Sequence, residues 1–215
     1  MTKRTLPRMS VAVGYLKGGT SKTKTAMYLA LGLAATGDTV AVLDTDQANA
    51  TATMWRRLAG DEWPENVTVE RWREDDAETV VEACSRLLET HRHLVVDTGP
   101  GGREILADVL SVARDLVCPL LASRDEVLSL RTTLEVASRA TDEHDIGLHL
   151  LLTKVRKNSV LLRESREELE AMGLPVMKSV VTLLDVYQDA TGTAPEDLGE
   201  YAAVLEELIT ERADA

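Results

Sequence analysis

The chain of 215 residues contains no phenylalanine, and its only aromatic residues are three tryptophans and four tyrosines. Its core must therefore consist mainly of leucine, valine, alanine and isoleucine, a composition that suits parallel strands covered by helices. No run of about 18 apolar residues is present, the length that a transmembrane helix needs. The basic start, residues 1–8, lacks the apolar segment of a secretory signal. We expect a cytoplasmic protein that neither crosses a membrane nor is secreted.

Cysteines and basic residues are also scarce. The two cysteines, Cys84 and Cys118, are far apart and lie in apolar surroundings, which disfavours a disulfide framework or a cysteine metal cluster and fits a reducing compartment. Lysine and arginine number 24 against 36 acidic residues, so the formal net charge is −12. A protein that coats nucleic acid with its whole surface is thereby disfavoured, although a local basic patch remains open.

Hydrophobic segments typical of buried strands alternate with helical patterns along the whole chain. We expect one α/β domain over residues 1–215, with residues 1–8 flexible. The expected strands are 11–15, 39–43, 67–71, 93–97, 116–121, 148–153 and 175–181. The expected helices include 25–35, 50–58, 75–90, 125–140, 160–172, 184–190 and 196–212. This alternation predicts a mostly parallel, twisted sheet with helices on both faces.

A glycine-rich loop separates the first expected strand from the first expected helix. Gly18 and Gly19 allow positive φ angles, so that backbone N–H groups can converge on an anion, and the helix that follows directs its positive dipole end to the same place. Lys22 supplies a charge for the β- and γ-phosphates, and Thr23 a hydroxyl for Mg²⁺. The alternative is an ordinary strand-to-helix turn with surface lysines. The predicted nucleotide-binding residues are Lys17, Gly18, Gly19, Thr20, Ser21, Lys22, Thr23 and Lys24.

The general phosphate-loop pattern G-x-x-x-x-G-K-[ST] would place glycine at positions 16 and 21, where this chain has Leu16 and Ser21. The loop matches K-G-G-x-x-K-T better. In this it resembles the deviant Walker A loop of the ParA/MinD group of ATPases. The resemblance implies a single-domain P-loop NTPase with ATP and Mg²⁺ as cofactors. It also implies that Lys17 reaches across a homodimer interface to the partner's nucleotide.

Carboxylates end two of the expected strands, at the edge of a parallel sheet where ligands bind. Asp97 follows an apolar strand, where a buried carboxylate calls for a cation such as Mg²⁺. Asp44 and Asp46 resemble the D-x-D-P-Q segment of ParA-like ATPases, although its proline is absent: Gln47 either replaces the proline or is the glutamine of that segment after a one-residue deletion. The resemblance places Asp44 near the metal's water shell and Asp46 beside the attacking water. A helix cap or a solvated turn is the alternative. The predicted metal site thus comprises Thr23, Asp44 and Asp97, and the predicted catalytic residues are Lys17, Lys22 and Asp46.

The segment after Asp97 is similar to the switch II region of the same ATPases, in which D-T-P-P is commoner. Gly99, Gly101 and Gly102 provide a backbone that can rearrange when a γ-phosphate is bound or lost. Arg103 is either a contact to a partner subunit or a plain surface residue.

The chain is most similar to small ParA-like partitioning ATPases without an N-terminal helix-turn-helix. The resemblance implies an ATP-bound dimer that binds double-stranded DNA without sequence preference, a nucleoid-associated location, and release when a ParB-like adaptor stimulates hydrolysis. A phosphate-contacting patch or a merely solvated face is formed by Arg156, Lys157, Arg163 and Arg166. Two alternatives stay open: a biosynthetic enzyme of this fold, such as an ATP-dependent amidase or ligase, and a nucleotide-gated binding module with little hydrolysis.

Other branches of the group fit less well. A MinD-like membrane cycler would end in a basic amphipathic helix, but residues 201–215 carry mainly acidic side chains, so we expect no membrane partner. A relative of the nitrogenase iron protein would need cysteines in loops, whereas Cys118 lies inside an expected strand.

Overall fold

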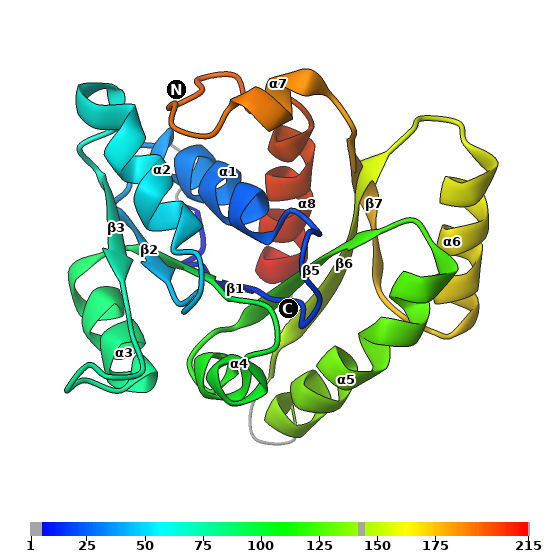
Figure 1. Cartoon of the computed structure of the whole chain (residues 1–215), viewed down its shortest axis with the longest axis horizontal. Helices are drawn as coiled ribbons and strands as arrows, with labels where there is room; N and C mark the ends of the chain where they lie inside the picture. The colour runs from blue at the N-terminus through cyan, green and yellow to red at the C-terminus, as the bar shows by residue number, and fades with distance from the viewer. Residues whose placement is uncertain (1–5, 142–144, 215) are drawn as a thin grey trace.

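The structure, a computed structural model, describes residues 6–141 and 145–214. Within these residues seven strands form one sheet in the order β3-β2-β4-β1-β5-β6-β7, and every neighbouring pair is parallel (Figure 1). The strands are β1 (Ser10–Val13), β2 (Val40–Asp44), β3 (Val67–Arg71), β4 (His93–Asp97), β5 (Asp115–Leu121), β6 (Gly147–Val155) and β7 (Val176–Thr182).

Eight α-helices and a 3₁₀ turn, η1 (Gly60–Glu62), connect the strands within the described residues. The helices are α1 (Lys22–Ala34), α2 (Thr51–Ala59), α3 (Val80–Thr90), α4 (Arg103–Leu110), α5 (Arg124–Thr141), α6 (Val160–Ala171), α7 (Asp185–Asp189) and α8 (Glu200–Asp214). The predicted α/β class, a parallel sheet with helices on both faces, is confirmed.

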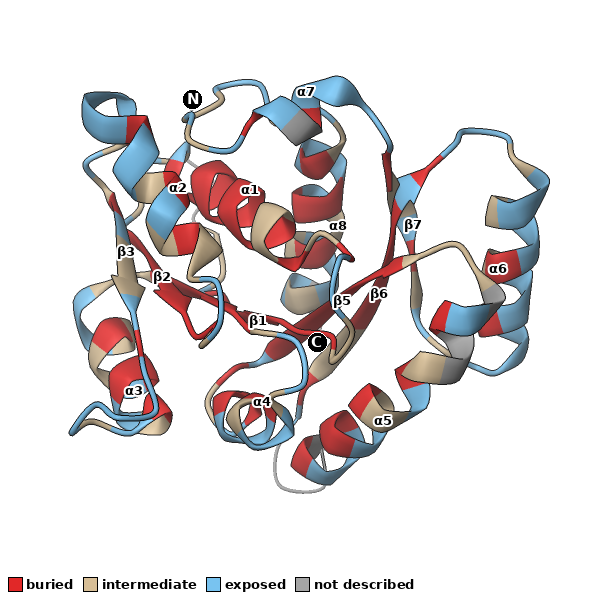
Figure 2. Cartoon of the chain, viewed as in Figure 1, coloured by how far each residue is buried: buried red, intermediate tan, exposed pale blue. Residues whose placement is uncertain are grey.

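Helices α1, α2, α7 and α8 cover one face of the sheet, and α3, α4, α5 and α6 cover the other (Figure 1). Alternate strand residues feed the two layers, so that Val11 and Val13 pack under α1 while Ala12 packs on the opposite side. The buried residues of the strands and of the helix faces that meet them appear as red bands in Figure 2. Because both faces of each central strand are buried, these strands are continuously apolar rather than alternating.

Two helices begin four or five residues later than the sequence pattern suggested. Helix α3 begins at Val80 because Thr79 and Glu82 form a capping box, in which each side chain bonds the backbone N–H of the other residue. Helix α8 begins at Glu200, whereas the prediction placed its start at residue 196.

The scarce aromatic residues are concentrated around α1. Tyr28 stacks on Tyr201 with ring centroids 4.6 Å apart and meets Trp55 and Tyr187 edge-on at 6.3 and 5.6 Å. This cluster joins α1, α2, α7 and α8. The aliphatic core predicted for the sheet is therefore completed by an aromatic core among the helices of one layer. Cys84 and Cys118 are free and fully buried, as expected.

Helix α8 is held at both ends. At its start Glu200 accepts hydrogen bonds from the Thr182 N–H and hydroxyl, at 2.6 and 2.8 Å. At its end Arg212 donates to both carboxylate oxygens of Asp115 at 3.0 Å. His149 lies beside that pair, 3.0 Å from Asp115 and 2.9 Å from Glu211. The helix thus runs from the carboxyl edge of the sheet to the opposite edge.

The expectation that residues 1–8 are flexible falls mostly outside the described residues. Of the described part, Leu6 packs against the core, and its carbonyl accepts a hydrogen bond from Arg92 at 2.7 Å. Across residues 6–141 and 145–214 we find no helix with the length and apolarity that spanning a bilayer would take.

Candidate nucleotide-binding site

The loop between β1 and α1 turns through two left-handed residues. Gly19 has φ 80°, as predicted, but Gly18 does not take a positive φ. The second left-handed residue is Ser21, with φ 73° and ψ 23°, immediately before the helix. This is the position at which the general loop pattern has glycine, because a side chain in the left-handed region costs roughly 1–2 kcal/mol. Ser21 therefore keeps the loop geometry at a cost in strain.

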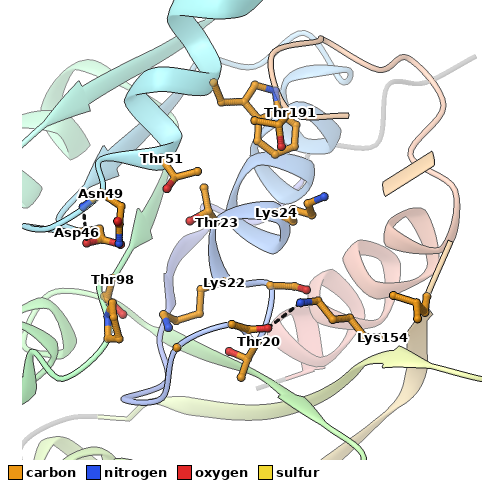
Figure 3. A pocket seen from close by; sticks show the side chains of 16 residues that line it. Thr20, Lys22, Thr23, Lys24, Asp46, Asn49, Thr51, Thr98, Lys154 and Thr191 are labelled. Carbon is orange, nitrogen blue, oxygen red and sulfur yellow. Dashed lines mark hydrogen bonds between the residues drawn. The ribbon is translucent and has the colours of Figure 1, made fainter. Parts of the chain in front are cut away.

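An open pocket of about 520 Å³ lies over this loop at the carboxyl edge of the sheet (Figure 3). The predicted loop residues from Gly18 to Lys24 line one wall. The remaining lining residues come from the ends of other strands and from nearby helices: Asp46, Asn49, Thr51, Trp55, Thr98, Pro100, Lys154, Leu183 and Thr191. Segments that are distant in the sequence thus line one pocket over the β1–α1 loop.

Lys22 is the buried cation of the pocket. Its side chain is 7% exposed, and its ammonium donates to the Lys17 carbonyl at 2.7 Å. Burial lowers the pKa of Lys22, while the negative charges of Asp97 and Asp46 oppose that shift. Nearby, the buried hydroxyl of Thr20 has no hydrogen-bond partner in the described part of the chain. Both groups are thus placed for an anion such as phosphate.

The end of β6 supports the loop from its far side. The Lys154 ammonium donates to the Gly19 carbonyl at 2.7 Å (Figure 3). The Thr153 hydroxyl donates to the Thr20 carbonyl at 3.1 Å. Lys24 donates to the Tyr187 carbonyl, and burial together with the charge of Lys154 lowers its pKa. Three lysine side chains therefore surround the pocket.

Asp97 ends β4 directly beside the loop and is 1% exposed. Neither carboxylate oxygen of Asp97 accepts a hydrogen bond from residues 6–141 or 145–214. Burial raises the pKa of Asp97 to about 8; the nearby Thr23 hydroxyl and Lys22 lower it, and Asp44 and Asp46 raise it further.

Two unpartnered buried oxygens next to a threonine hydroxyl fit a divalent cation. No group of three His, Cys, Asp or Glu residues in the described chain is arranged to hold a metal. Mg²⁺ characteristically binds one or two carboxylates together with phosphate oxygens and water, so this arrangement suits Mg²⁺ that arrives with a nucleotide.

Asp44, in contrast, has protein partners for both of its carboxylate oxygens. One oxygen accepts from the N–H and the hydroxyl of Thr53, both at 2.8 Å, and the other accepts from the Asp46 N–H at 3.2 Å. Asp44 thereby ties the first turn of α2 to the end of β2. Its predicted place in the metal's water shell stays a prediction.

Asp46 lines the pocket and also organises the turn that follows it. Its Oδ1 accepts from the N–H groups of Ala48 and Asn49 at 3.0 and 3.1 Å. A Cβ added to Gly99 would come 3.1 Å from the Asp46 Cα, so the switch-like segment and this turn are in close contact. A movement of the Gly99 backbone would therefore displace the neighbouring Asp46.

The turn after the D-x-D aspartates contains no proline and is held by hydrogen bonds of the Gln47 side chain. The Gln47 amide donates to the carbonyls of Thr45 and Trp72 at 3.1 and 3.2 Å, and its oxygen accepts from the Glu74 N–H at 3.1 Å. The contacts with Trp72 and Glu74 connect the D-x-D turn to the segment after β3, and the contact with Thr45 lies within the turn.

Lys17 lies apart from the other predicted nucleotide-binding residues. It is not among the residues that line the pocket, its side chain is 40% exposed, and its ammonium lies 2.5 Å from a carboxylate oxygen of Glu126 in α5. The structure thus brings Lys22, Thr23 and Asp46 together and directs Lys17 elsewhere.

The candidate DNA-contacting residues occupy two places. Arg156 and Lys157 are exposed in the loop after β6, where Lys157 pairs with Glu200 at 2.8 Å, a contact that raises the pKa of Lys157. Arg163 and Arg166 lie on α6 within 4.0 and 3.6 Å of Glu167 and Glu170. Arg166 also donates a hydrogen bond to the Met177 carbonyl in β7 at 2.8 Å, so its side chain lies against β7 and does not project freely outward.

The profile of the family described as CbiA, the CobQ/CobB/MinD/ParA nucleotide binding domain, matches residues 11–192. The chain belongs to this family. The matched CbiA region runs from β1 to the loop after α7 and contains the whole pocket. No curated protein sequence resembles the chain closely enough to count as a relative.

Solved structures with this fold include proteins of several functions. A putative plasmid partition protein of Borrelia burgdorferi bound to AMPPNP has a TM-score of 0.71 and 16% identity, over 97% of this chain and 99% of that one. The cobyrinic acid a,c-diamide synthase of Mycobacterium smegmatis, with ADP and magnesium, has a TM-score of 0.71 and 19% identity over 95% of both chains. The cell division ATPase MinD of Pyrococcus furiosus has a TM-score of 0.70 and 18% identity, over 96% and 99%. At these identities the likeness establishes the fold.

Sequence reasoning missed several pocket residues of this CbiA domain. Asn49, Thr51 and Trp55 come from the turn before α2 and from α2 itself, and Thr191 follows α7. The only sequence signal for Asn49 and Thr51 is that they follow the D-x-D strand end. Nothing in the local sequence indicates that Trp55 or Thr191 faces the pocket.

Proposed function

We propose that the chain is a Mg²⁺-dependent ATPase that partitions DNA. Its ATP-bound sandwich dimer binds double-stranded DNA without sequence preference, and a ParB-like adaptor stimulates the hydrolysis that releases it. Such a protein associates with the nucleoid while ATP is bound. The rate of ATP hydrolysis would then set how long the dimer persists.

The observation that carries the proposal is the separation of the two loop lysines. Lys22 occupies the pocket of its own chain, whereas Lys17 is 40% exposed and lies outside that pocket. A lysine that its own phosphate site does not use is suited to a nucleotide held by a second copy. An active site completed in this way exists only while two chains are associated.

Phosphoryl transfer depends mainly on positioning and on neutralising charge. Lys22 and the loop N–H groups would bind the phosphates, and the Thr23 hydroxyl and Asp97 would hold Mg²⁺, which supplies further positive charge when bound. Asp46 would orient the attacking water after its carboxylate is released from the Ala48 and Asn49 N–H groups. The contact of Gly99 with Asp46 offers a route by which the switch segment controls that release.

For DNA, the exposed loop with Arg156 and Lys157 is the best-placed part of the predicted basic patch. It follows β6, whose end supports the phosphate loop, so it lies near the nucleotide. A dimer would present this loop twice, and each phosphate contact adds to the dependence of binding on salt.

The test is an electrophoretic mobility shift on plain duplex DNA with ATP, with ADP and without nucleotide. We expect retardation with ATP alone, weakened by salt and by replacing Arg156 and Lys157 with alanine. Arg131→Ala, which removes an exposed arginine on α5, is the matched control and should bind normally. Equal binding in all three states, or none, would contradict the proposal.

The fold likeness to the diamide synthase supports a second candidate, a biosynthetic ATP-dependent amidase or ligase. Such an enzyme would hydrolyse ATP in response to a small substrate and would be indifferent to DNA. Measuring ATP turnover with and without duplex DNA separates the two functions.

A further inference from the structure

The segment that leads into the phosphate loop is attached to α5. The Tyr15 hydroxyl donates to the backbone carbonyl of Glu126 at 3.0 Å, and the Leu16 N–H donates to the hydroxyl of Thr133 at 3.3 Å. Lys17 follows directly and makes its 2.5 Å ion pair with the Glu126 side chain. Three consecutive residues are therefore held along one helix.

The two partners of this ion pair differ sharply in exposure. The Lys17 side chain is 40% exposed, whereas that of Glu126 is 1% exposed. The other carboxylate oxygen of Glu126 has no hydrogen-bond partner within residues 6–141 and 145–214. Lys17 is also the only cation that forms an ion pair with Glu126 in that part of the chain. In the described chain the buried charge of Glu126 is thus neutralised by one half-exposed lysine side chain.

Such a pair is costly to open. If Lys17 leaves, Glu126 remains as a buried and unpaired carboxylate, which is strongly unfavourable. An exposed surface pair would impose no comparable restraint, because water would replace the lost partner. The burial of Glu126 therefore decides how readily Lys17 can move to another anion.

We propose that Glu126 is a positioning residue that keeps Lys17 on its own chain, so that ATP-dependent association has to break the Lys17–Glu126 ion pair. This rests on the proposed function, in which Lys17 serves a partner's nucleotide. The Lys17 ammonium stays paired with Glu126 until the triphosphate bound to a second copy of the chain competes for it. The carboxylate thereby opposes association of chains that carry no triphosphate.

A purely structural ion pair makes the opposite prediction. If the pair only stabilised the fold, removing the charge of Glu126 would leave association unchanged or weaken it. If Glu126 restrains Lys17, removing the charge makes Lys17 available and strengthens association. The sign of the change separates the two roles.

The experiment compares the full-length wild type with Glu126→Gln, using sedimentation equilibrium with Mg²⁺ and AMPPNP, a non-hydrolysable analogue. We expect the dimer Kd of Glu126→Gln to fall by at least about 10-fold, because association of this variant no longer has to break a buried ion pair. The affinity of the monomer for AMPPNP should stay unchanged. Asp125→Asn, which removes an exposed negative charge from the same helical turn, is the matched control and should behave as wild type.

A second readout follows Lys17 in the nucleotide-free protein. Acetylation of its amine by a water-soluble ester, quantified by peptide mass spectrometry, should be faster in Glu126→Gln than in wild type and unchanged in Asp125→Asn. Should Glu126→Gln not fold, Glu126→Asp takes its place, because the shorter side chain retreats from Lys17, and the same direction of change is expected.

The outcomes distinguish this inference from the proposed function. A wild type that dimerises with AMPPNP while Glu126→Gln dimerises equally or more weakly overturns the inference alone. An unchanged acetylation rate of Lys17 in Glu126→Gln overturns it as well. If wild type and Glu126→Gln both stay monomeric with AMPPNP, the dimer of the proposed function and this inference are both overturned.

Discussion

Replacing Asp97 with asparagine should stabilise the nucleotide-free protein and at the same time abolish its response to Mg²⁺. The carboxyl is buried without a hydrogen-bond partner in the described chain, and its pKa rises from the ordinary 3.8 to about 8. Because the folded pKa is the higher one, ionisation opposes folding. The penalty is absent below about pH 4, grows as the pH rises, and levels off above about pH 8.

The magnitude follows from the size of the shift. Between pH 4 and pH 7 the folded carboxyl stays mostly protonated while the unfolded one ionises, and about 3 pKa units at 1.36 kcal/mol each give roughly 4 kcal/mol. Asparagine cannot ionise, so the variant escapes this penalty. Its free energy of unfolding should match that of wild type near pH 4 and exceed it by up to about 4 kcal/mol at pH 7.

The assay is urea unfolding in EDTA at several pH values, followed by the fluorescence of the buried tryptophans. Asp108→Asn, an exposed aspartate on α4, is the control and should keep the wild-type pH dependence. Adding Mg²⁺ with AMPPNP should stabilise wild type but not Asp97→Asn. Parallel pH profiles for wild type and Asp97→Asn would refute the reasoning, because they would mean that the Asp97 charge is compensated in the folded state.

Three further substitutions test the loop and the D-x-D turn. Lys17→Ala should remain folded but neither hydrolyse ATP nor dimerise with it, and unchanged turnover in a phosphate-release assay would remove its role between subunits. Asp46→Ala should still bind ATP and should trap the dimer on size-exclusion chromatography; loss of nucleotide binding would instead assign Asp46 to the turn alone. Ser21→Gly should raise the free energy of unfolding by about 1 kcal/mol, because glycine tolerates φ 73°. An unchanged midpoint of thermal unfolding (Tm) in Ser21→Gly would indicate that the backbone of Ser21 is not strained.

The sheet was predictable because its signals are local. Seven apolar segments with short polar boundaries correspond to the seven described strands. The start of α3 was also within reach, since Thr79 and Glu82 have the spacing of a capping box. The start of α8 was not, because it is set by contacts of Glu200 with β7 and with the loop after β6.

In the candidate site, the positions of residues were easier to predict than their partners. Lys22 and Asp97 lie where the strand-loop-helix order requires. The ion pair between Lys17 and Glu126 joins segments distant in the sequence and depends on how α5 packs against the loop. Likewise, the hydrogen bonds that occupy Asp44 come from Thr53 and from the backbone of the next turn, which a strand-end pattern does not show.

The anchoring of α8 at both ends has a practical use. A helix of 15 residues is about 22 Å long, and this one leads from Glu200 near the nucleotide pocket to Arg212 at the far edge of the sheet. A fluorophore or affinity handle attached to its last turn would therefore sit well away from bound ATP. Because Asp115 clamps that end, such a probe would report tumbling and assembly of the whole molecule rather than fraying of a loose tail.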